Sequence, residues 1–149
     1  MLSITIDDIK KYEPNILDYG IDSFEQDITE AAKDVTRDLR IRWWPSYANS
    51  GKYDISVLNS SLEMDDGKLT ASQFTRAVVY FALGYHIMPK LSSFNAESDL
   101  FERKFEFYRK EYSREFEKVV LDGVEYDLDS SGSITNSEKE PTYYRRLKR

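Results

Sequence analysis

Twelve consecutive residues near the C-terminus combine oxygen-bearing side chains with a central glycine. The segment is Asp127-Leu128-Asp129-Ser130-Ser131-Gly132-Ser133-Ile134-Thr135-Asn136-Ser137-Glu138. A hard cation such as Ca²⁺ needs several oxygen atoms that converge around a sharp turn, and this segment supplies carboxylates, hydroxyls and a backbone carbonyl. The candidate metal ligands are Asp127, Asp129, Ser131, Ser133 through its carbonyl, Thr135 and Glu138. The first chemistry that the sequence suggests is therefore calcium binding.

The spacing fits the twelve-residue calcium loop of an EF-hand, with oxygen donors at positions 1, 3 and 5, glycine at position 6 and glutamate at position 12. Three features argue against a regulatory sensor. Position 5 is a serine, the segment after Glu138 has an early proline and no apolar stripe, and no second loop follows the same pattern. Two alternatives stay open: a loop that binds Ca²⁺ alone, or a β-hairpin whose Asp and Ser residues suit a turn.

Two adjacent tryptophans, Trp43 and Trp44, precede Pro45 at the end of a predicted helix. Neighbouring residues on a helix point about 100° apart, so we expect only one indole to face the core. The other is either covered by the loop after Pro45 or exposed as an anchor for another protein. Both tryptophans are candidate interface residues.

The C-terminal tail is basic and contains two tyrosines. Its candidate interface residues are Tyr143, Tyr144, Arg145, Arg146, Lys148 and Arg149. Four positive charges lie in the last five residues of a chain whose formal net charge is -6, so the charge is polarised along the sequence. The tail suits docking on an acidic protein surface; contact with nucleic acid and a frayed end are the alternatives.

Composition excludes much enzyme chemistry. The chain of 149 residues has no cysteine and one histidine, which rules out disulfides, thiolate zinc sites, cysteine nucleophiles and centres with several histidines. That histidine, His86, lies in an apolar segment, where we expect a hydrogen bond to the backbone. Apart from the possible Ca²⁺, no cofactor is expected.

The N-terminus lacks the features of a secretory signal, and the longest apolar run, 77–88, is shorter than the ~20 residues of a membrane span. We therefore expect an intracellular protein that does not enter a membrane.

Apolar spacing and capping patterns predict a mainly α fold. A short N-terminal helix opens at Thr5, with Asp8 three residues later. Longer helices open at Ser23, with Gln26 three residues later, and at Thr70, with Gln73 three residues later. The third of these ends before Pro89. A fourth helix of about 25 residues carries an aromatic seam at helical spacing, formed by Phe101, Phe105, Tyr108, Tyr112, Phe116 and Val119.

These elements predict two regions. Residues 1–122 form a small bundle of three main helices with the short N-terminal helix packed on it. Residues 123–149 form a β-hairpin-like segment that includes the calcium-loop pattern, followed by an extended basic tail. Residues 45–69 carry turn motifs, and their periodicity does not choose between helix and extended chain.

The order of these features resembles the head-to-tail connector proteins of tailed bacteriophages, also called adaptor, head-completion or neck proteins. The resemblance covers most of the chain. It rests on Ile4-Thr5-Ile6-Asp7-Asp8-Ile9, Ala31-Ala32-Lys33-Asp34-Val35, the apolar helix 74–88, Phe107-Tyr108-Arg109-Lys110-Glu111-Tyr112 and Gly123-Val124-Glu125-Tyr126-Asp127-Leu128-Asp129. It is a similarity of layout, and the calcium-loop spacing departs from that layout.

The resemblance implies a structural subunit and not an enzyme. Such proteins assemble as a homo-oligomeric ring, commonly of twelve copies, between the portal protein and the tail or neck proteins, and genomic DNA passes transiently through the channel. The implied location is the neck of the virion, after synthesis in the host cytoplasm. The alternative is a calcium-binding protein-interaction module that uses the single loop 127–138. An acid–base enzyme would need two carboxylates in different environments, which a sequence cannot show.

Overall fold

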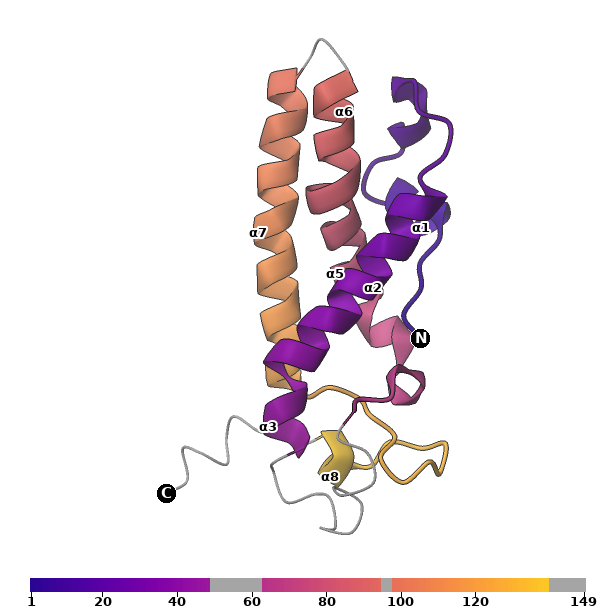
Figure 1. The fold of residues 1–149 in the computed structure, drawn as a ribbon, viewed down its shortest axis with the longest axis vertical. Helices are drawn as coiled ribbons and strands as arrows, with labels where there is room; N and C mark the ends of the chain where they lie inside the picture. Colours follow the sequence, from indigo (N-terminus) through magenta and orange to yellow (C-terminus); the bar gives the residue numbers. More distant parts are fainter. Residues whose placement is uncertain (49–62, 95–97, 140–149) are drawn as a thin grey trace.

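The computed structural model describes residues 1–48, 63–94 and 98–139, and the chain within these ranges is mainly helical. Its body consists of α2 (Glu25–Arg42), α5 (Thr75–Phe81), α6 (Met88–Phe94) and α7 (Ser98–Asp122). Figure 1 shows α7 running beside α6 and α5, while α2 crosses them obliquely. The mainly α fold class is thus confirmed.

Short elements complete both ends of this body. At the N-terminal side lie α1 (Ile6–Lys10) and a 3-10 turn, Ile16–Tyr19. At the opposite end, α3 (Trp44–Ala48) and α8 (Asn136–Lys139) lie close to the end of α7 (Figure 1). Two further 3-10 turns, Asp66–Lys68 and Ala71–Phe74, lead into α5.

The predicted cap of α1 is confirmed, whereas the two longer helices begin differently from prediction. The Asp8 carboxylate accepts bonds from the Thr5 backbone N–H at 2.9 Å and the Thr5 hydroxyl at 3.1 Å. By contrast, α2 begins at Glu25 without a side-chain cap, and Ser23 Oγ only accepts a long 3.4 Å bond from the Glu25 N–H. Thr70 opens a 3-10 turn, and the regular α5 starts at Thr75.

The prediction that the third helix ends before Pro89 is wrong. The chain stays helical through Pro89 to Phe94, because residues Ala82–Ile87 form a π-helical segment between α5 and α6. Within it, the Met88 N–H donates to the Leu83 carbonyl, five residues earlier. Proline lacks an N–H and its ring clashes with the carbonyl four residues back in an α-helix. In the wider π turn, hydrogen bonds run to the carbonyl five residues back, so the proline neither breaks a required bond nor meets the carbonyl four residues back.

The predicted β-hairpin in the C-terminal segment is also wrong. Residues 123–139 are all described, and they contain no strand and end in α8. Instead of pairing with itself, the segment makes an isolated antiparallel bridge between Tyr126 and Leu69. The Thr70 N–H donates to the Glu125 carbonyl at 3.1 Å, and the Asp127 N–H donates to the Lys68 carbonyl at 3.0 Å. The start of the segment is thus paired with a distant part of the chain, whereas residues 128–132 hydrogen-bond locally.

The core forms around the continuous helical run α5, the π-helical segment and α6, which packs against α7, while α2 packs against α5 and the π-helical segment. The aromatic seam predicted for α7 is confirmed, since Phe101, Tyr108, Tyr112, Phe116 and Val119 are buried and Phe105 is partly buried. Two polar bonds join α2 to the helical run beside it, Lys90 to Asp27 at 2.7 Å and His86 to Asp34 at 2.9 Å. A third joins Tyr108 on α7 to Glu13, in the segment after α1, at 2.8 Å. His86 thus bonds to a carboxylate on α2 and not to the backbone as predicted.

Candidate metal site and candidate interface residues

The loop 127–132 folds tightly around the carboxylate of Asp127. The Asp127 oxygens accept bonds from the Ser131 N–H at 3.0 Å and the Gly132 N–H at 2.9 Å. Two residues have positive φ values, Ser130 at 57° and Gly132 at 82°. Glycine adopts this conformation without steric cost, and serine does so less readily. The turn therefore aims several polar groups toward the inside of the loop.

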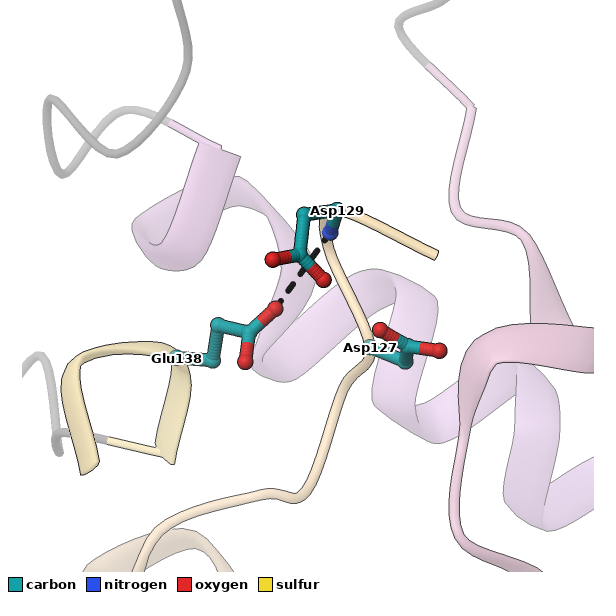
Figure 2. A group of neighbouring side chains, drawn as sticks. All are labelled: Asp127, Asp129 and Glu138. Atoms are coloured by element: carbon teal, nitrogen blue, oxygen red, sulfur yellow. Dashed lines mark hydrogen bonds between the residues drawn. The ribbon is translucent and has the colours of Figure 1, made fainter. Parts of the chain in front are cut away.

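Glu138 closes the loop from the opposite side. It lies on α8, whose first turn is capped by Thr135: Glu138 Oε2 accepts from the Thr135 N–H at 2.8 Å and from its hydroxyl at 3.0 Å. The second oxygen, Oε1, accepts from the Asp129 N–H at 3.3 Å, as the dashed line in Figure 2 shows. The residue is buried. α8 covers the end of the predicted loop and extends one residue past it, to Lys139; the chain after Lys139 lies outside the described residues, and the expectation that no regular helix follows the loop stays a prediction.

The carboxylates of Asp127, Asp129 and Glu138 come together, with one oxygen of each lying within 4.8 Å of the others. Hydrogen bonds from Ser131 lower the pKa of Asp129, and the backbone N–H of Thr135 lowers the pKa of Glu138. Both groups are therefore charged at neutral pH. Three carboxylates at this separation form the kind of oxygen cluster that Ca²⁺ prefers.

The remaining predicted ligands are engaged in other contacts. Ser131 Oγ donates to the Ser133 carbonyl at 3.1 Å, and the Thr135 hydroxyl donates to Glu138. The Ser133 carbonyl oxygen keeps a second lone pair, with which it could still ligate a cation. The structure brings together the three carboxylates of the predicted set, and it uses the hydroxyls to shape the loop.

Both tryptophans are buried, which corrects the expectation that only one faces the core. Trp43 is 3% exposed and Trp44 is 5% exposed. The helix breaks at Trp43, so that Trp44 begins α3 along a new axis and both indoles reach one aromatic cluster with Tyr47 and Tyr126. Both indoles are thus covered within the chain, by Tyr47 of α3 and by Tyr126 among others, and neither is exposed as an anchor for another protein.

The candidate interface residues Tyr143, Tyr144, Arg145, Arg146, Lys148 and Arg149 lie outside the described residues, and their proposed docking role stays a prediction.

Large apolar side chains on the outer face of α7 escaped the sequence reasoning. Leu100, Phe107 and Leu121 are 45%, 55% and 42% exposed. Successive members lie seven and fourteen residues apart, so they share one face of the helix. Their spacing was visible in the sequence, but the dense charge around them indicated a solvated face.

Comparison with known proteins yields no match to this chain among family models, curated proteins or solved structures. Within the described ranges, no helix combines the length and the apolar character that a membrane crossing requires.

Proposed function

We propose that this chain is a structural subunit of a head–tail connector ring in a tailed bacteriophage, which links the portal to the tail and forms part of the DNA channel. The proposal starts from the sequence layout described above. A helical body built on α2, α5–α6 and α7 is compatible with that layout.

The observation that carries the proposal is the outer face of α7. Leu100, Phe107 and Leu121 are exposed there at three of four successive heptad positions, with the charged Arg114 at the remaining one, and apolar residues at heptad spacing favour packing against another helix. Single exposed apolar residues are common on protein surfaces, but a row along one helix is typical of a contact surface. In a ring, this face would meet the neighbouring subunit.

The charge distribution supports the same function. The chain has 27 acidic and 21 basic side chains, and four of the basic ones lie in the last five residues. An acidic surface repels the phosphates of DNA, so a channel lined by such subunits would let DNA pass without binding it. The basic tail would dock on an acidic surface of the portal or of a neighbouring subunit.

A measurement of particle mass with and without the portal protein tests this proposal. The wild-type chain should be a monomer alone and a ring on the portal. Phe107→Glu should weaken ring formation by about tenfold or more, because burying a charge without a partner in an apolar contact is unfavourable.

The matched control is Ile41→Glu on α2, which places the same charge at an apolar residue that is 64% exposed and outside the α7 row. This variant should assemble like the wild type. A wild-type chain that stays monomeric on the portal would contradict the proposal, as would an Ile41→Glu variant that loses assembly to the same extent.

A second candidate function is calcium-dependent interaction with another protein. It is favoured by one specific observation: the three carboxylates that converge within 4.8 Å belong to a loop whose sequence has the EF-hand spacing. Because position 5 lacks a carboxylate, we expect weak binding, on the order of 10⁻⁴ to 10⁻³ M.

Titration calorimetry with CaCl₂ tests this candidate. The wild type should release or absorb heat on binding and unfold at a higher temperature in Ca²⁺, since a ligand that binds only the folded state stabilises it. Asp127→Ala should abolish both effects. Glu117→Ala, which removes an exposed carboxylate on α7 outside the cluster, should retain them. A wild type without a calorimetric response would eliminate the candidate.

A further inference from the structure

A groove on the surface of α2 is separate from the features discussed so far. One wall is the N-terminal segment Met1–Ile4, and the other is α2 from Ile28 to Arg40. Its volume is about 340 Å³. The side chains of Leu2, Ile4, Ile28 and Ala32 line it and are themselves largely buried. The floor of the groove is therefore apolar.

The rim of the groove on α2 is cationic. Lys33, Arg37 and Arg40 line it at helical spacings of four and three residues, which places them along one face over about 10 Å. In the described part of the chain, neither arginine has an ion-pair partner, and the pair between Lys33 and Glu30 at 3.1 Å is exposed. Exposed pairs contribute little and exchange readily. Asp66, at one end, is the only carboxylate among the described lining residues.

The wall formed by the N-terminal segment offers backbone groups. Residues 2–4 belong to no helix or strand, and within the described ranges their N–H and C=O groups have no hydrogen-bond partner. The segment is held at its two ends. The terminal ammonium of Met1 donates to the Asp66 carbonyl at 3.2 Å, and Thr5 caps α1. An ordered backbone with free donors and acceptors can accept an added peptide strand.

We propose that this groove binds an extended, acidic segment of a partner protein, with its apolar side chains on the floor and its carboxylates at Arg37 and Arg40. In an extended peptide, every second side chain lies on the same side and the repeat is about 6.8 Å. Two carboxylates on such a peptide can therefore reach different cations of the row. Arginine also binds carboxylates through two parallel hydrogen bonds, which adds specificity.

The length of the cationic row and the free backbone favour a peptide over a fatty acid, which carries one carboxylate and no backbone. The inference does not depend on the connector proposal, because it concerns α2 and the N-terminal segment and not the outer face of α7. Either can fail while the other holds.

Fluorescence anisotropy with labelled peptides tests the proposal on the full-length chain. The probe is a short peptide of alternating leucine and glutamate, and the reference peptide has glutamine in place of glutamate. The acidic peptide should bind about tenfold tighter or more than the reference, because charge-assisted hydrogen bonds from arginine to a carboxylate are stronger than those to a neutral amide. In Arg37→Gln/Arg40→Gln this preference should disappear. Both arginines are exposed, so the variant should fold normally.

The matched control is Arg103→Gln/Lys110→Gln, which removes two exposed cations from α7 and changes the net charge equally. It should keep the preference for the acidic peptide. The proposal is overturned if the acidic peptide does not bind the wild type, or if the control variant loses the preference as well. Binding of sodium dodecanoate without binding of the peptide would also overturn it, because the ligand would then be a free amphiphile.

Discussion

Two glycines adopt positive φ values in the C-terminal segment, for different reasons. Gly123 follows α7 with a φ of 109°, and a Cβ there would lie 2.1 Å from the Lys139 carbonyl oxygen. Gly132, in the acidic loop, has a φ of 82°, but nothing lies within 4 Å of a Cβ. Gly123 is required both by its backbone conformation and by the close approach of α8, whereas Gly132 is required by conformation alone.

Gly123→Ala should therefore destabilise the protein more than Gly132→Ala. The left-handed conformation costs an alanine about 1–2 kcal/mol at either position. At Gly123 the new methyl group must also displace the backbone at Lys139, which adds roughly 1–3 kcal/mol. Urea unfolding in the presence of EGTA measures both free energies without a contribution from Ca²⁺. Equal decreases in the free energy of unfolding of the two variants would show that α8 does not press against Gly123.

Single residues were predictable where their partners lie nearby in the sequence. The bond between Thr5 and Asp8 spans three residues, and the carboxylates of Asp127 and Asp129 share one turn. Gln73 illustrates the opposite case. The sequence places it in a helix cap, yet its amide donates to the Gly123 carbonyl at 2.8 Å and accepts from the Glu125 N–H at 2.9 Å. No local pattern reveals a partner fifty residues away.

At the scale of elements, periodicity identified the long helices and failed at their boundaries. The seam on α7 was predictable because it repeats over a helix of 25 residues. The continuation of the helix through Pro89 was not predictable, because it depends on packing between helices. A Cβ at Gly84, within the π-helical segment, would lie 2.9 Å from the Arg109 backbone nitrogen. The π-helical segment and α7 thus approach closely at Gly84, and the Arg109 side chain donates to the Gly84 carbonyl at 2.9 Å.

The predictions for the two tryptophans and for the hairpin were wrong for the same reason. Both assumed that a segment continues its local geometry, whereas contacts with residues far away in the sequence determine its structure. Tyr126 packs against Trp43 and Trp44, and its neighbours hydrogen-bond with residues 68 and 70. The free energy gained by burying this aromatic cluster outweighs the weak preference of a short polar segment for strand pairing.

For the whole molecule, three hydrogen-bonded carboxylates link folding to pH. The pKa of Asp8 is lowered mainly by the Thr5 backbone N–H, that of Asp129 by bonds from Ser131, and that of Glu138 by the Thr135 backbone N–H. A lowered pKa in the folded state means that the unfolded chain binds protons first as the pH falls. These groups therefore stabilise the fold above their ordinary values of 3.8 for aspartate and 4.5 for glutamate.

That stabilisation should begin to be lost as the pH falls past these ordinary values and should be gone once the pH lies below the lowered pKa values of the folded state. The triple variant Asp8→Asn/Asp129→Asn/Glu138→Gln should be less stable than the wild type at pH 7. Its free energy of unfolding should change less steeply over this range, so that the two curves converge at low pH. Urea unfolding at several pH values, with EGTA present, measures this convergence.

The control Glu117→Gln, at an exposed carboxylate of α7, should follow the wild-type slope. A constant difference between wild type and triple variant down to pH 3 would show that these hydrogen bonds do not depend on the charge of the carboxylates.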